Sequence, residues 1–170
     1  MALLRAAGIE LLEDGARPPD ADNPLGYHEY EPVKRLPHDT GWLETAEGRA
    51  VKVIHALLPA LPEGPRYRVV LMRRELGDVV ASQDRMLARR GESQGRLGAD
   101  RLVEVLAAQI EGARAWLRAR PQVAWMELDY DALLRDPAPG LARLAGFVAS
   151  RVPPAALAAS IDRRTGLQRP

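Results

Sequence analysis

Three short apolar runs along the chain predict β-strands. They occupy residues 50–55, 66–72 and 122–128, and the run at 66–72 is rich in β-branched residues, which favour extended backbone. The run at 66–72 is followed at once by arginine and then by a helical pattern. We therefore expect a sheet built around these segments.

Helices are predicted between and around these strands. The strongest pattern covers residues 100–118, where apolar residues recur about every three to four positions along one face. Asp100 is predicted to cap its amino end, and Gly8 to end the first helix. Shorter helical segments are expected at residues 1–7, 27–36, 41–46, 57–61, 75–90, 130–134, 140–150 and 153–161.

Strands separated by helices of this length predict an α/β fold. Parallel strands need long crossover connections, and helices usually supply them. The sequence contains no internal repeat and no domain boundary, so residues 1–170 are expected to form one domain.

Composition permits this fold and excludes several kinds of site. The chain is 46% hydrophobic and contains no cysteine, which excludes disulfides, thiolate metal sites and cysteine nucleophiles. A net charge of +1 gives no electrostatic reason to expect binding to nucleic acid or to an acidic membrane. The histidines are dispersed without metal-ligand spacing. Neither a signal peptide nor a membrane-spanning run is found, so a cytoplasmic protein is expected.

The junction at residues 71–83 carries the clearest candidate chemistry. Arg74 stands between the predicted strand and the predicted helix, and Ser82 follows eight positions later within the helix. A guanidinium beside the unpaired N–H groups at the start of a helix is well suited to bind a phosphate. It adds bidentate, charged donors to the oriented backbone donors of the helix. The serine hydroxyl can add a neutral donor.

This spacing resembles the element with which sulfotransferases bind the 3′-phosphate of 3′-phosphoadenosine 5′-phosphosulfate. Further segments are similar to that family, and particularly to a bacterial branch of it. They are the Asn-Pro-x-Gly-Tyr loop within residues 20–31, a strand like Lys-Thr-His-Leu-Pro at 51–59, and a segment like Tyr-Glu-x-Leu-x-x-Asp-Pro at 130–137.

The resemblance implies a fold, a reaction and a cofactor. The fold is a three-layer parallel sheet with helices on both faces, as in P-loop nucleoside triphosphatases. The reaction transfers a sulfonate from 3′-phosphoadenosine 5′-phosphosulfate to a small-molecule hydroxyl or amine acceptor, which the sequence does not identify. A small-molecule kinase of the same architecture is a weaker alternative, because it would need magnesium-binding groups and an intact phosphate loop.

The sequence departs from the family at its amino end. Sulfotransferases begin with a strand and a Gly-x-x-Arg-Ser-Gly-Thr-like loop that holds the 5′-phosphosulfate, and the chain matches only the end of the helix that follows. The sequence is therefore expected to be amino-terminally truncated and, by itself, poorly stable and inactive. The alternative function is a non-catalytic family member that at most binds the nucleotide or serves as an interaction module.

The resemblance also assigns roles to individual side chains. It implies that Arg74 and Ser82 bind the cofactor and that Lys52 offsets charge on the transferred group. His55 is the candidate base, because an imidazole exchanges protons near neutral pH. It lies three positions after Lys52, whereas the family histidine lies two positions after its lysine, so His28 is kept as the rival base. Lys52 can alternatively pair with a carboxylate, and Ser82 can be a small residue on a packed helix face.

Overall fold

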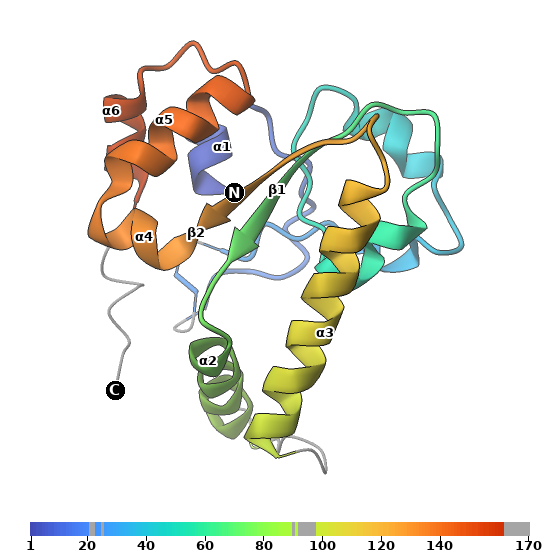
Figure 1. The fold of residues 1–170 in the computed structure, drawn as a ribbon, viewed down its shortest axis with the longest axis vertical. Coiled ribbons are helices and arrows are strands. Elements are labelled where there is room, and N and C mark those ends of the chain that lie inside the picture. The colour runs from blue at the N-terminus through green and yellow to red at the C-terminus, as the bar shows by residue number, and fades with distance from the viewer. Residues whose placement is uncertain (21–22, 25, 90, 92–97, 162–170) are drawn as a thin grey trace.

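The computed structural model describes residues 1–20, 23–24, 26–89, 91 and 98–161 (Figure 1). The α-helices are α1 (Ala2–Ala6), α2 (Leu76–Arg89), α3 (Ala99–Arg118), α4 (Tyr130–Arg135), α5 (Pro137–Phe147) and α6 (Pro154–Leu157). The 3₁₀ helices are η1 (Glu31–Arg35), η2 (Gly41–Ala46), η3 (His55–Ala60) and η4 (Ala158–Ser160), and the strands are β1 (Arg68–Arg73) and β2 (Ala124–Asp129).

The described residues form a small parallel sheet of β1 and β2. The register runs from Arg68 opposite Ala124 to Arg73 opposite Asp129. Helices α2 and α3 make the crossover, pack against each other and extend from the body beyond the carboxyl ends of the strands (Figure 1). The predicted α/β class and the parallel pairing are thereby confirmed, and both strands deliver the residues that follow them to one edge of the sheet.

The predicted strand at residues 50–55 is wrong. In the described part of the chain, this segment makes only an isolated parallel bridge between Leu11 and Ala50, and His55 already begins η3. Residues 51–54 have no regular structure. A strand exists by pairing with a neighbour, and composition alone does not supply that neighbour.

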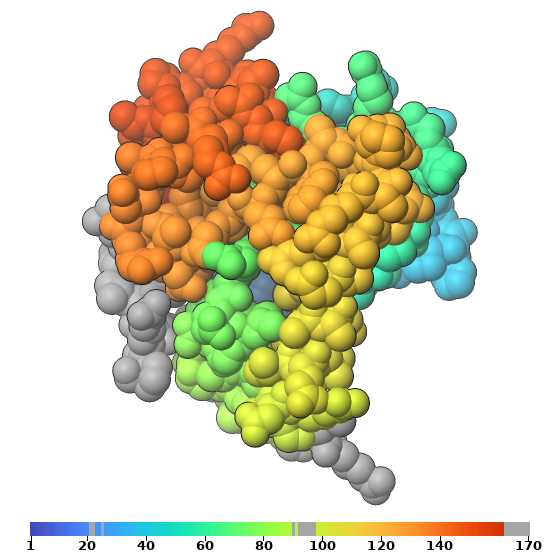
Figure 2. Space-filling view, viewed as in Figure 1, coloured from blue at the N-terminus to red at the C-terminus, as the bar shows by residue number. Residues whose placement is uncertain are grey.

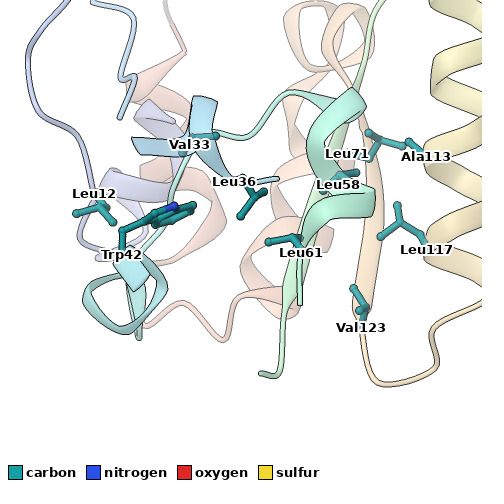
Figure 3. Close-up of a cluster of buried hydrophobic side chains, with 10 residues drawn as sticks. All are labelled: Leu12, Val33, Leu36, Trp42, Leu58, Leu61, Leu71, Ala113, Leu117 and Val123. Atoms are coloured by element: carbon teal, nitrogen blue, oxygen red, sulfur yellow. The ribbon is translucent and has the colours of Figure 1, made fainter. Parts of the chain in front are cut away.

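A hydrophobic core lies on one face of the sheet (Figure 3). Leu71 from β1 meets Ala113 and Leu117 from α3, and η3 adds Leu58. Val51 and Val53 pack against the same core without belonging to a strand. The remaining buried members are Leu12, Val33, Leu36, Trp42, Leu61 and Val123.

A second core lies on the opposite face of the sheet, because successive side chains of a strand point to opposite sides. Met126 and Leu128 of β2 pack there with Leu141 and Leu144 of α5. Its other buried members are Ala7, Leu133, Ala145 and Leu157. Helices therefore cover both faces of the strand pair.

Several details of the helices differ from the prediction. Gly98, and not Asp100, occupies the N-cap of α3, and Asp100 lies in the first turn, where a carboxylate still suits the helix dipole. The segment 27–36 forms only the 3₁₀ helix η1, with Pro32 near its start. Gly8 follows α1 with a φ of +87°, as expected for a residue that ends a helix.

Among the described residues, no helix is both long enough and apolar enough to cross a membrane.

Candidate functional site

Arg74 lies at the carboxyl edge of the sheet, between the end of β1 and the start of α2. Its guanidinium carbon is 5.1 Å from the centre of the Tyr130 ring, which is a cation–π contact. Its Nε atom is buried and has no hydrogen-bond partner among the described residues. A buried donor without an acceptor is costly, so an anion that accepts from this group would relieve the cost.

Contacts beside Arg74 join the end of β1 to the end of β2 and to the start of α4. Arg73 Nη2 donates to Asp129 Oδ2 at 2.6 Å across the ends of the two strands. Asp129 Oδ1 also accepts from the Ala132 N–H at 2.7 Å, which caps α4 and places Tyr130 in its first turn. The Ala132 N–H first, and then Arg73, hold the pKa of Asp129 below its usual range.

Helix α2 begins two residues after Arg74, so its first backbone N–H groups lie close to the guanidinium in sequence. Ser82 lies within α2 and is half-buried. Asp78 occupies the first turn of the same helix and adds a carboxylate there. The contacts of the described residues do not join Ser82 to Arg74, so the pairing of these two side chains remains a prediction.

Lys52 pairs with the segment that leads into η1. Its Nζ donates to the Tyr27 carbonyl at 3.1 Å and to Glu29 Oε1 at 3.4 Å. The lysine side chain is 40% exposed, which leaves the ammonium accessible to solvent. The carboxylate pairing that the sequence left open for Lys52 is therefore present.

Tyr27 connects this lysine to α2. The Arg17 guanidinium carbon lies 3.3 Å from the centre of the Tyr27 ring, and Arg17 Nη2 contacts Met86 Sδ of α2 at 3.6 Å. The Tyr27 hydroxyl donates to Asp20 at 2.8 Å. The sequence analysis did not identify Arg17 as a candidate. Its partners Tyr27, Met86 and Glu29 lie in other segments of the chain, and no local pattern places them beside it.

His28, the rival base, is held by a carboxylate. Its Nδ1 lies 2.6 Å from Glu13 Oε2, and Arg5 contacts the other oxygen of Glu13. The hydrogen bond from His28 is the main reason that the pKa of Glu13 lies below its usual range. His28 also has a φ of +50°, which is uncommon for a residue other than glycine.

His55 contacts a different helix. It begins η3, and its Nε2 lies 3.0 Å from Gln109 Oε1 of α3. If Nε2 carries the proton and donates to this amide oxygen, Nδ1 keeps a free lone pair. Among the described residues, Lys52, His55 and Arg74 therefore each contact a different partner, and no contact joins them in one site.

Comparisons of the chain with models of known protein families, with curated proteins and with solved structures give no match.

An ion pair joins α3 to β2. Arg114 Nε donates to Glu127 Oε1 at 2.5 Å and Nη2 donates to Oε2 at 3.0 Å, so the contact is bidentate. Arg114 also contacts Glu111, and its side chain is only 17% exposed. Arg114 is the main reason that the pKa of Glu127 lies below its usual range.

This pair makes stability depend on pH. The folded-state pKa of Glu127 is lower than in the unfolded chain, so its contribution is present above about pH 4.5 and is lost as pH falls through the folded-state value. Urea unfolding between about pH 7 and about pH 3 should show a smaller loss of stability for Glu127→Gln than for the unchanged chain, by about 1 kcal/mol or less. Identical pH profiles would contradict the pairing. Glu104→Gln is the control, because its carboxylate pairs with Arg101 at an exposed position on α3, where such a pair contributes little.

Proposed function

We propose that this chain is a sulfotransferase-like domain that transfers a sulfonate from 3′-phosphoadenosine 5′-phosphosulfate to a small-molecule hydroxyl or amine acceptor. The fold proposed with it is a three-layer parallel sheet with helices on both faces. The observation that carries the proposal is Arg74, whose buried Nε lacks an acceptor among the described residues at the junction of β1 and α2. The identity of the nucleotide is proposed from the sequence resemblance to sulfotransferases.

The residues at this junction fit the 3′-phosphate of such a nucleotide. Arg74 would donate to the phosphate through its guanidinium, and the first N–H groups of α2 would add donors. Ser82 would add its hydroxyl. Tyr130 would keep the guanidinium plane oriented, because it contacts Arg74 through the ring face. When bound, the nucleotide supplies the activated sulfonate.

The other candidate residues would act on the acceptor. His55 Nδ1 would take the proton of the acceptor hydroxyl or amine, since hydrogen bonding of Nε2 to Gln109 orients the ring. Lys52 would offset negative charge that grows on the leaving phosphate, as an ammonium can do from an exposed position. For this, Lys52 would have to exchange part of its contact with Glu29 for the nucleotide.

The proposal is tested by the binding of 3′-phosphoadenosine 5′-phosphate. Isothermal titration should show that Arg74→Ala weakens binding by about 2 kcal/mol, because a charge-assisted contact to phosphate is lost. Arg74→Lys should recover only part of the loss, since an ammonium lacks the bidentate fork. Arg66→Ala removes the same charge from an exposed position before the other end of β1 and serves as the control.

Unchanged affinity in Arg74→Ala, or an equal loss in Arg66→Ala, would contradict the assignment. Adenosine 5′-phosphate supplies a second control, because it lacks the 3′-phosphate. Its affinity should be weak and should not respond to Arg74→Ala.

A second candidate function is a domain that binds the nucleotide without catalysis. It is favoured by the engagement of Lys52 with Glu29 and of His55 with Gln109, since neither side chain is presented to Arg74 by the described contacts. The two functions are separated by incubation with donor labelled in the sulfonate and a panel of phenols, alcohols and amines. Binding of the nucleotide without transfer to any acceptor would favour the second.

A further inference from the structure

A narrow pocket lies at the amino ends of the two strands, whereas Arg74 lies at their carboxyl ends. It holds about 190 Å³ of space, partly open to solvent, between the segment before β1 and the segment that joins α3 to β2. Figure 2 shows these two segments beside each other at the upper right, green before β1 and orange at the end of α3. The lining residues used below are Pro62, Glu63, Tyr67, Trp116, Arg120 and Val123.

Two buried donors of the pocket lining have no acceptor. Trp116 Nε1 and Arg120 Nε are buried, and neither has a hydrogen-bond partner among the described residues. The Arg120 guanidinium carbon lies 4.2 Å from the centre of the Trp116 ring, so the two donors belong to side chains in direct contact. An indole N–H and a guanidinium can only donate, so neither can satisfy the other. Because unpaired buried donors are costly, this pair favours a ligand that accepts hydrogen bonds.

The fold holds the walls of the pocket in place. Trp116 belongs to α3 and packs against the first hydrophobic core. The Val123 N–H donates to the Arg120 carbonyl at 2.9 Å, which ties the arginine to the start of β2. The Tyr67 hydroxyl donates to the Pro62 carbonyl at 3.1 Å and so ties the segment before β1 to itself. Both walls are therefore fixed close to the strands that they precede.

The charge and the walls of the pocket favour a carboxylate. Among the described lining residues, Arg120 is the only cation, and the prolines, Tyr67 and Val123 supply apolar surface. One guanidinium balances one negative charge, whereas a phosphate dianion would leave charge unbalanced against these walls. Glu63 and Gln122 are exposed members of the lining, so their long side chains can turn outward to admit a ligand.

We propose that this pocket binds a carboxylate group, supplied by a small aliphatic acid or by the carboxyl terminus of a peptide, through Trp116 and Arg120. One carboxylate oxygen accepts from the indole N–H, and the other accepts from the guanidinium, whose charge it balances. Pro62 and Val123 offer contact to the aliphatic part of the ligand. The pocket and Arg74 lie at opposite ends of the strands, so this site goes beyond the proposed function and does not depend on it.

The test follows the indole N–H signals of the full chain by ¹⁵N nuclear magnetic resonance while propionate is added at constant pH. The Trp116 signal should move downfield and reach saturation, because its N–H gains a charged acceptor. Trp42 is the internal control, since its Nε1 is also buried and unpartnered among the described residues but lies in the core, outside the pocket. Trp116→Phe identifies the signal by its loss. A Trp116 signal that stays in place, or that moves together with the Trp42 signal, would overturn the proposal.

A matched pair of variants tests the contribution of the guanidinium. Arg120→Gln should weaken propionate binding by about tenfold or more, because a charge-assisted contact is lost. Arg118→Gln removes the same charge from an exposed position at the end of α3 and should leave affinity unchanged. Circular dichroism establishes that both variants are folded, and equal affinities of the two would overturn the proposal. The titration of the unchanged chain tests the site without either variant.

Glu63→Gln tests whether Glu63 itself occupies the pocket. The variant should bind propionate more tightly by about two- to threefold, because a like charge beside the pocket is removed. The Trp116 signal of the free variant should stay close to that of the unchanged chain. An upfield shift as large as the downfield shift caused by propionate would show that the Glu63 carboxylate is the acceptor, and it would overturn the proposal.

Titrations with the tripeptide Gly-Gly-Val and with its carboxyl-terminal amide identify the source of the carboxylate. Tighter binding of the free tripeptide than of propionate supports a peptide terminus as the ligand, and the reverse order supports a small acid. The amide should not shift the Trp116 signal, because it lacks the charge. Binding of the amide as tight as that of the free tripeptide, or of inorganic phosphate tighter than that of propionate, would overturn the proposal.

Discussion

Under the proposed function, replacement of His55 by alanine should lower sulfonate transfer by about two to four orders of magnitude, which is the range for loss of a general base. Affinity for 3′-phosphoadenosine 5′-phosphate should change little, because His55 contacts Gln109 of α3 and not the residues around Arg74. Turnover with labelled donor and titration with the unlabelled nucleotide measure the two effects separately.

His28→Ala is the matched comparison, because the two histidines were the rival bases. His28 is bound to Glu13, which also contacts Arg5, so its replacement should reduce stability more than turnover. If His28→Ala abolishes transfer while His55→Ala does not, the base is His28. Gln109→Ala should lower turnover less than His55→Ala, since it removes only the group that orients the ring.

The largest effect on stability is expected for Leu141→Ala. Leu141 is fully buried between α5 and the face of the sheet that carries Met126 and Leu128. Truncation of a buried leucine leaves a cavity and costs about 2–5 kcal/mol. Urea denaturation followed by circular dichroism should show the loss as a lower midpoint with an unchanged slope.

Leu102→Ala is the control for this change. It makes the same substitution within a helix, but Leu102 is only half-buried near the start of α3 and belongs to neither core cluster. Its cost should be about 1 kcal/mol or less. Equal destabilisation by the two variants would mean that α3 is buried more deeply near its start than the structure indicates.

Local sequence signals predicted the junction on which the proposal rests. The expected strand at 66–72 and helix at 75–90 correspond to β1 and α2, with differences of about one or two residues at each end. These signals are strong because β-branched residues and helix formers meet there without proline or glycine clusters. The helix at 100–118 was similarly evident, since its apolar face repeats over several turns and becomes α3.

Contacts between distant segments could not be predicted in the same way. Arg74 meets Tyr130, and Arg114 meets Glu127, only because β1 and β2 pair in a particular register. No local pattern carries that register. The error at 50–55 has the same origin, because Val51, Val53 and Ile54 favour a strand in the sequence whether or not a neighbouring strand exists to pair with them. In the described part of the chain, Ala50 finds only the bridge to Leu11.

The crossover through α2 and α3 also has a consequence for the kinetics of folding. Arg73 and Asp129, which meet at the ends of the paired strands, are 56 residues apart along the chain. Closing so long a loop is entropically costly, and docking of α2 against α3 shortens the effective distance between the strands before they pair. We therefore expect the helical pair to form before the sheet, so that weakening its interface slows folding more than it accelerates unfolding.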